Sequence, residues 1–173
     1  MNINIIVACD KNNLIGKNGT LPWKIKEDWD YFLEKINDGV LIMGRKCYLD
    51  FQEQAKSRTV IALSRNPDVN FKYADKAGSL SEALKMAKSY QKEIWICGGC
   101  SIYEEAFPIA DRLYLTEIDA EYEGDVFLPE WKSFFQNEIS FGVSNLTNLT
   151  KNYIQQDKNT ISDTKFAVSR YFW

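Results

Sequence analysis

Four short apolar segments rich in Ile and Val constrain the fold of this chain more than any other feature. They lie at residues 3–9, 40–43, 59–63 and 94–97, and polar side chains are rare within them. A strand exposed on one face would alternate polar and apolar residues, so these runs predict strands buried on both faces. Such strands need a covering layer on each side of their sheet.

Helical patterns between these segments supply the covering layers. Residues 25–36 and 80–87 each place their apolar side chains on one stripe, and a third helical segment, 101–107, follows Gly98 and Gly99. Short buried strands that alternate with helices are typical of a mostly parallel sheet. We therefore predict an α/β fold with a central, twisted, mostly parallel sheet and helices on both of its faces.

The C-terminal third follows a different pattern. Segments 113–118, 134–141 and 166–173 come without an intervening helical stripe, which predicts antiparallel strands that form a C-terminal hairpin. The polar stretch 144–164 is expected to be an exposed loop in that hairpin. A length of 173 residues suits one sizeable core, so we expect a single domain over residues 1–173.

Composition narrows the classes of partner and site. The 21 basic and 24 acidic residues give a net charge of −3, so nucleic acid is not an expected partner. No apolar run is long enough to span a membrane and the N-terminus lacks a leader pattern, so we expect a cytoplasmic protein. The Cys97–Cys100 pair has C-x-x-C spacing, but there is no histidine and no second such pair, so no metal site is expected.

Asp28 is the strongest candidate for chemistry. Without histidine, proton chemistry near neutral pH must use a carboxylate, a thiol, a tyrosine or bound water. Asp28 falls at the edge of the apolar stripe beside Trp29 and Phe32, where burial would raise its pKa unless a partner compensates. A planar ligand with two adjacent N–H donors would be such a partner. Alternatively, Asp28 only supplies negative charge to the first turn of its helix.

Glycines and cations mark candidate anion sites at the ends of the predicted strands. Gly98 and Gly99 stand where a strand passes into a helix, so a phosphate could approach the backbone there, although the pair is also typical of an ordinary tight turn. Ligands of open α/β sheets collect beyond the carboxyl ends of the strands. Side chains there that could hold anions are Arg45, Lys46, Ser64 and Arg65, and Arg58 could meet a carboxylate. Each is alternatively a solvated surface residue.

Several motifs in a fixed order carry a resemblance to a known family. They are IIVACDKNNLIGKNGTLPW, the D-x-x-x-F of Asp28 and Phe32, VLIMGRK, the segment 58–64, IWICGGCSIYEEA and LYLTEIDAEYEGDVFLP. Over nearly its whole length, the chain resembles dihydrofolate reductase. The resemblance implies reduction of 7,8-dihydrofolate to 5,6,7,8-tetrahydrofolate, with hydride from NADPH and protonation through water.

Matched positions imply the roles of individual residues. The catalytic set is Asp28, Leu21, Trp23 and Thr116, with Asp28 accepting hydrogen bonds from the pterin and Thr116 joining its network. The substrate would also contact Ile6, Trp29, Phe32, Phe51, Cys97 and, through its glutamate carboxylate, Arg58. NADPH would be held by Ala8, Ile15, Gly16, Leu21, Arg45, Lys46, Cys47, Ser64, Arg65, Gly98, Gly99, Cys100, Ser101, Ile102 and Tyr103. Residues 16–21 would form a mobile lid.

The chain departs from the family pattern at a few of these positions. Cys97 replaces an aliphatic residue, Cys100 a frequent third glycine, Cys47 a threonine that touches the cofactor, and Ser101 an arginine of some relatives. Trp29 is bulkier than the usual wall residue, so altered antifolate affinity is expected.

The expected partners are dihydrofolate and antifolates, and a monomer is expected. Two alternative functions stay open: an NADPH-dependent reductase of another heterocycle, as in the riboflavin pathway, and a non-catalytic folate- or antifolate-binding protein.

Overall fold

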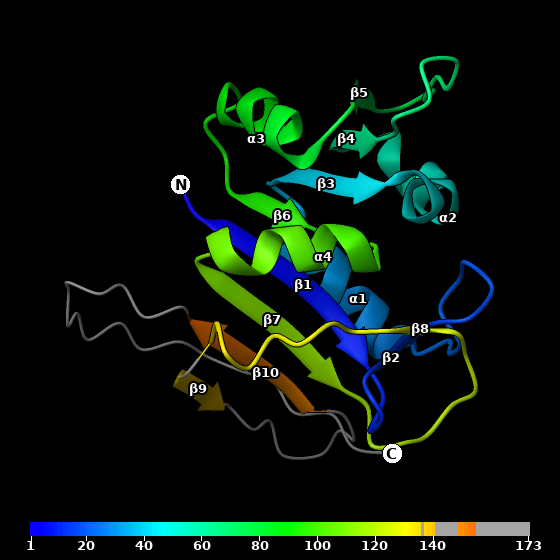
Figure 1. The fold of residues 1–173 in the computed structure, drawn as a ribbon, viewed down its shortest axis with the longest axis vertical. Helices are drawn as coiled ribbons and strands as arrows, with labels where there is room; N and C mark the ends of the chain where they lie inside the picture. The colour runs from blue at the N-terminus through cyan, green and yellow to red at the C-terminus, as the bar shows by residue number, and fades with distance from the viewer. Residues whose placement is uncertain (136, 141–148, 155–173) are drawn as a thin grey trace.

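A computed structural model describes residues 1–135, 137–140 and 149–154 of the chain (Figure 1). Its main sheet has eight strands in the order β5-β4-β3-β6-β1-β7-β10-β9. A separate antiparallel pair joins β2 (Leu14–Gly16) to β8 (Val126–Phe127). The main sheet contains β1 (Ile3–Cys9), β3 (Val40–Gly44), β4 (Thr59–Leu63), β5 (Asp75–Ala77), β6 (Ile94–Ile96), β7 (Arg112–Glu117), β9 (Asn137–Ser140) and β10 (Leu149–Ile154).

The predicted mostly parallel sheet is confirmed. Strands β5, β4, β3, β6, β1 and β7 are parallel neighbours, whereas β10 is antiparallel to both β7 and β9. The strand expected at 113–118 is β7, which is antiparallel to β10 as predicted but also runs parallel to β1 on its other side. The helical segment after Gly98 and Gly99 provides the crossover that a parallel connection needs.

The expected exposed loop at 144–164 is also corrected in part. Residues 149–154 form β10, which pairs with β7 from Leu149–Glu117 to Ile154–Arg112. Polar side chains do not prevent a strand when a neighbouring strand can accept its backbone hydrogen bonds, and sequence pattern alone does not reveal that neighbour. Within the expected strand 134–141, β9 covers 137–140. The rest of the expected loop and the expected strand at 166–173 lie outside the described residues.

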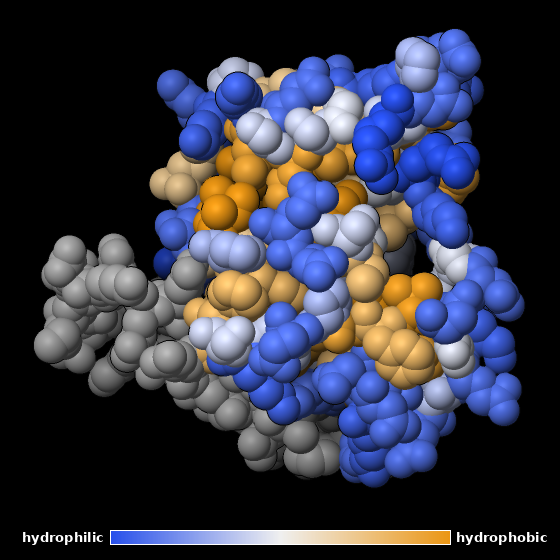
Figure 2. Space-filling view, viewed as in Figure 1, coloured by the Kyte–Doolittle hydropathy of each residue, from blue (hydrophilic) through white to orange (hydrophobic). Residues whose placement is uncertain are grey.

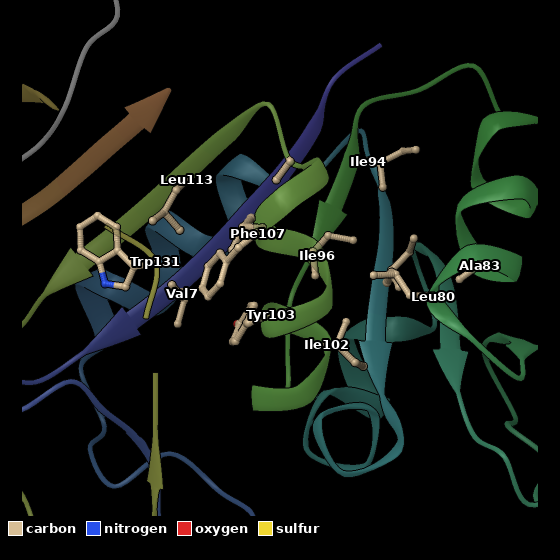
Figure 3. Close-up of a cluster of buried hydrophobic side chains, with 14 of the residues drawn as sticks. Val7, Leu80, Ala83, Ile94, Ile96, Ile102, Tyr103, Phe107, Leu113 and Trp131 are labelled. Carbon is tan, nitrogen blue, oxygen red and sulfur yellow. The ribbon is translucent and has the colours of Figure 1, made fainter. Parts of the chain in front are cut away.

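Helices cover both faces of the sheet and bury two apolar clusters. On one face lie α3 (Leu80–Lys88), α4 (Cys100–Ala106) and the short helix η1 (Phe107–Ile109). Figure 3 shows side chains of α3 and α4 directed toward the strands of this face. On the other face lie α1 (Lys26–Lys35) and α2 (Arg45–Ala55), whose apolar side chains pack around Leu41 and Trp95. No helix of the described residues is long and apolar enough to cross a membrane.

Parallel pairing brings the carboxyl ends of the central strands together at one edge of the sheet. Ala8 of β1 lies beside Thr116 of β7. The amide of Gly44, at the end of β3, donates to the carbonyl of Gly98 over 2.8 Å, and the Cys97 amide donates to the carbonyl of Ile42 over 2.9 Å. The ends of β1, β3, β6 and β7 therefore converge on the edge where open α/β sheets bind ligands.

Candidate active site at the carboxyl edge of the sheet

Asp28 meets Thr116 at this edge. Asp28 lies in the first turn of α1 and is half-buried, and its carboxylate forms a side-chain hydrogen bond with Thr116, which is buried at the end of β7. Burial raises the pKa of Asp28 from 3.8 to about 6, and the Thr116 hydrogen bond opposes part of that rise. The prediction of a half-buried acid with a raised pKa is confirmed.

An aromatic cluster extends from Asp28 along α1 and α2. The ring centroids of Trp29 and Phe32 are 5.4 Å apart, and Phe51 of α2 lies 6.2 Å from Trp29 and 5.8 Å from Phe32. The guanidinium of Arg58 lies over the Phe51 ring at 5.9 Å. The site therefore has a carboxylate at one end, an apolar wall in the middle and a cation at the other end.

The hydrogen bonds of the Arg58 side chain do not use all of its N–H donors. One of its terminal nitrogens donates to the carbonyl of Gln54 over 3.0 Å and contacts the Ser57 hydroxyl over 3.3 Å. Its Nε is buried without an acceptor among the described residues. A guanidinium fixed in this way can still bind an anion through its remaining N–H groups.

A cavity of about 310 Å³ lies beside Asp28. Leu21, Trp23 and Trp29 line it together with Lys24, Ile25 and Lys26. Trp23 is buried and packs on Tyr122 with ring centroids 5.3 Å apart, and its indole Nε1 has no acceptor among the described residues. Leu21 is 46% exposed at the end of the loop that precedes the cavity. The cavity thus combines apolar side chains with two lysines and one acid, a mixture that suits a small-molecule site.

Ile6 and Cys97 belong to the apolar cluster that also contains Trp29, Phe32 and Phe51. Ile6 is buried, and its carbonyl accepts the hydroxyl of Tyr103 over 2.9 Å. The thiol of Cys97 donates to the Trp95 carbonyl over 3.5 Å, and burial holds its pKa well above the usual thiol range. Cys97 is therefore a neutral, apolar lining residue at neutral pH.

The Gly98–Gly99 turn is closely packed on its inner side. Gly98 has a φ of +109°, and a Cβ added there would lie 3.1 Å from the Tyr103 hydroxyl and 3.3 Å from the Cys47 sulfur. A Cβ on Gly99 would lie 3.7 Å from the Cys47 sulfur. Burial raises the pKa of Cys47 to about 11, so its thiol is protonated where it packs on the turn. Only glycine fits Gly98 without a shift of its neighbours.

Cationic side chains follow the neighbouring strands β3 and β4 at their carboxyl ends. Arg45 and Lys46 are exposed at the start of α2, and Arg65 is exposed after β4. Within the described part of the chain, none of the three forms an ion pair with an acid. The hydroxyl of Ser64 accepts the backbone N–H of Asn66 over 3.3 Å and keeps its own proton to donate. The predicted anion-binding groups thus share one edge of the molecule.

The predicted lid is tied to the segment before β8. Gly16 pairs with Val126, and the backbone N–H of Asn18 donates to the Asp125 carboxylate over 3.0 Å. An exposed ion pair of 3.5 Å joins Lys17 to Glu123. The loop is therefore held in place mainly by polar contacts at the surface, which are individually weak.

Sequence reasoning missed Asp10. Its carboxylate is 2% exposed and accepts three backbone N–H groups, from Asn12, Leu14 and Tyr122, over 2.8, 2.9 and 2.9 Å. The run Asp-Lys-Asn-Asn at the end of an apolar strand is a turn signal, which would have found the first two contacts. Nothing local to the sequence indicates the third, because its donor lies 112 residues away.

The thiols of Cys97 and Cys100 form hydrogen bonds with different parts of the protein. The Cys97 thiol donates to the Trp95 carbonyl, whereas the Cys100 thiol donates to the Phe127 carbonyl over 3.3 Å. None of the four cysteines, all of which the structure describes, forms a disulfide. Among the described residues, no group of three or more Cys, Asp or Glu side chains is arranged to hold a metal ion.

A second cavity lies away from the Asp28 edge, between α3 and η1. It measures about 450 Å³ and is lined by Leu80, Leu84 and Ile109 with Lys85, Lys88, Ser81 and Glu105. Figure 2 shows apolar surface in the region between α3 and α4.

Together these features are those of an α/β enzyme that binds its ligands beyond the carboxyl ends of a parallel sheet, with the half-buried carboxylate of Asp28 lining a cavity. A family model for dihydrofolate reductase matches residues 2–159. The chain belongs to the dihydrofolate reductase family.

Individual relatives support this assignment. The chain is 35% identical to dihydrofolate reductase of Staphylococcus haemolyticus over 137 residues, which cover 76% of this chain and 82% of that protein. Identity to the Haemophilus influenzae enzyme is 34% over 174 residues, with coverage of 97% and 98%. A solved structure of Enterococcus faecalis dihydrofolate reductase, in complex with NADP(H) and RAB-propyl, aligns with a TM-score of 0.77 and 32% identity, covering 90% of this chain and 96% of that one.

Proposed function

We propose that this protein reduces 7,8-dihydrofolate to 5,6,7,8-tetrahydrofolate with NADPH, in a site built around Asp28. The observation that carries the proposal is the half-buried Asp28 carboxylate, bonded to Thr116 and facing a cavity of about 310 Å³. A carboxylate in this setting needs a ligand that offers N–H donors. The 2-amino group and the adjacent ring nitrogen of a pterin are two such donors in one plane.

Asp28 binds and polarises the pterin. Its pKa of about 6 means that it is ionised at neutral pH despite burial, and two N–H donors of the ligand compensate the lost hydration. By accepting these hydrogen bonds, the carboxylate shifts electron density into the pterin ring. This shift raises the basicity of the ring nitrogen that must gain a proton. The chain has no histidine, so water delivers that proton.

The aromatic cluster and Arg58 place the rest of the substrate. Trp29, Phe32 and Phe51 form one apolar wall for the pterin and benzoyl rings, with Ile6 and Cys97 below them. Arg58, fixed over Phe51, binds the carboxylate of the glutamate tail through N–H groups that its protein contacts leave available.

The residues at the glycine turn fit NADPH. The cofactor supplies the hydride when bound. Arg45, Lys46, Ser64 and Arg65 hold phosphate groups, because they are cations or a hydroxyl donor gathered at the strand ends without acidic partners among the described residues. Gly98 and Gly99 keep the backbone accessible, while Ala8, Ile15 and Leu21 border the nicotinamide.

The remaining predicted contacts fall on the lid and on the segment after the turn. Gly16, at the start of the lid, and Cys47, packed on the turn, contact the cofactor, as do Cys100, Ser101, Ile102 and Tyr103. Trp23 lines the substrate cavity together with Asp28.

Substrate discrimination tests the proposal. Purified protein is mixed with NADPH and either dihydrofolate or a riboflavin-pathway precursor, and the loss of NADPH absorbance is followed while mass spectrometry identifies the product. Formation of tetrahydrofolate in the first mixture alone supports the proposal. NADPH oxidation with the riboflavin precursor alone would assign another reductase, and binding of dihydrofolate without turnover would indicate a binding protein.

The proposal also covers the inhibitors, the oligomeric state and the cellular compartment of the protein. We expect antifolates to compete with dihydrofolate at Asp28, with affinities altered by the bulk of Trp29. The chain is proposed to work as a single-domain monomer in the cytoplasm. Sedimentation of the active protein at one monomer mass, and fractionation of the source cells, test these points.

A further inference from the structure

The carboxylate of Asp10 connects two segments that are far apart in the sequence. One oxygen accepts the backbone N–H groups of Asn12 and Leu14 and so fixes the turn that follows β1. The other oxygen accepts the backbone N–H of Tyr122, in the segment between β7 and β8. Because Asp10 is 2% exposed, these three bonds replace nearly all of its hydration.

Tyr122 connects the Asp10 carboxylate to the wall of the substrate cavity. Its ring packs on the Trp23 indole with centroids 5.3 Å apart. Trp23 is 6% exposed and belongs to a small apolar cluster with Ile25 and Ile118, separate from both main clusters. Trp23 also lines the cavity beside Asp28. A contiguous path therefore leads from the Asp10 carboxylate through Tyr122 to the cavity wall.

We propose that Asp10 is a positioning residue that holds Tyr122, and through it Trp23, in the geometry that the substrate cavity requires. The proposal rests on the proposed function, because the cavity is taken as the site of dihydrofolate. The separate apolar cluster around Trp23 is small, so packing alone gives that side chain little support. The partly buried Tyr122 N–H, which donates to the Asp10 carboxylate over 2.9 Å, adds a charge-assisted contact to that packing.

The substitution Asp10→Asn tests this chain of contacts, because asparagine has nearly the same shape as aspartate. The asparagine oxygen can still accept from Asn12 and Leu14, whereas its NH2 group meets the Tyr122 N–H as a second donor. We expect the KM for dihydrofolate to rise by about tenfold, the size of one lost charge-assisted bond, with the NADPH dissociation constant within about twofold of wild type. Asp119→Asn is the matched control, because its exposed 2.7 Å ion pair with Lys11 joins the same two segments.

A double-mutant cycle separates positioning from general stabilisation. Tyr122→Leu removes the ring on Trp23 but keeps the backbone N–H that Asp10 accepts. If Asp10 acts through that ring, the two substitutions together raise the KM little more than either one alone. A KM of the double variant that rises by the product of the two single fold-increases would overturn the proposal. An unchanged KM in Asp10→Asn, or a KM in Asp119→Asn that rises as much as in Asp10→Asn, would overturn it as well.

A second readout does not depend on the reaction. In the ligand-free protein, the NMR signal of the Trp23 indole N–H, assigned with Trp23→Phe, is expected to move in Asp10→Asn and in Tyr122→Leu but not in Asp119→Asn. Absence of dihydrofolate turnover in the wild type would refute the proposed function while leaving this signal to be measured. A Trp23 signal that stays in place in folded Asp10→Asn would refute the role of Asp10.

Discussion

Replacement of Asp28 by asparagine should stabilise the ligand-free protein while it removes activity. Burial raises the pKa of Asp28 from 3.8 to about 6, so ionisation of this residue is less favourable in the folded chain than in the unfolded chain. The difference between these two values corresponds to about 3 kcal/mol of unfolding free energy at pH 8. Asparagine carries no charge and avoids this cost.

The pH dependence gives the sign of the effect. Below about pH 4 the carboxyl group is protonated in both states and imposes no charge cost. Between about pH 4 and about pH 6 the unfolded chain ionises this group while the folded chain keeps it protonated, so the wild type loses stability relative to Asp28→Asn until the loss is complete above about pH 6. We expect the variant to gain up to about 3 kcal/mol by pH 8, less whatever its weaker contact with Thr116 removes.

Urea denaturation of the ligand-free proteins from about pH 4.5 to about pH 8 measures this difference. Asp30→Asn is the matched control, because Asp30 lies on the same helix but is exposed and paired with Lys26. Its stability relative to wild type should change little over this range. A gap between wild type and Asp28→Asn that is constant with pH, or that shrinks as the pH rises, would refute the reasoning.

Three further outcomes are expected. Direct binding of dihydrofolate should weaken by about tenfold per pH unit below about pH 6, as Asp28 is protonated, and calorimetric titration that finds pH-independent affinity would contradict this. Arg58→Gln should raise the KM for dihydrofolate by about tenfold or more but leave an analogue without the glutamate tail unaffected; equal losses for both would remove Arg58 from the tail site. Gly98→Ala should lower the free energy of unfolding by about 1–3 kcal/mol, because Gly98 has a φ of +109° and an added Cβ would press on Tyr103. Gly99→Ala should lower it less, and equal urea midpoints of the two variants would disprove this difference.

Much of the sheet and one side of the site could be predicted because their signals are local. Unbroken apolar runs identify buried strands such as 40–43 and 59–63, and the helical projection of 25–36 places Asp28 beside Trp29. A half-buried acid with a raised pKa follows from that placement, and the structure confirms it. These inferences need only the residues within a few turns of the one considered.

Features that depend on distant partners could not be predicted in this way. The parallel direction of β7 and the strand β10 are decided by which neighbours accept their backbone hydrogen bonds. The contact of Asp10 with Tyr122 spans 112 residues, and the placement of Arg58 over Phe51 depends on the packing of α2 against β4. The sequence pattern of each segment is compatible with several partners, and tertiary packing chooses between them.

Whether the Asp28 carboxylate makes this fold a dihydrofolate reductase is decided by a comparison of three proteins. Dihydrofolate-dependent oxidation of NADPH at neutral pH is measured for wild type, Asp28→Asn and Asp30→Asn at equal concentrations of folded protein. We expect full activity in wild type and Asp30→Asn, and a loss of about a hundredfold or more in kcat/KM for Asp28→Asn, because the substitution removes a half-buried charged partner in contact with substrate. Equal turnover by Asp28→Asn and wild type would contradict this expectation.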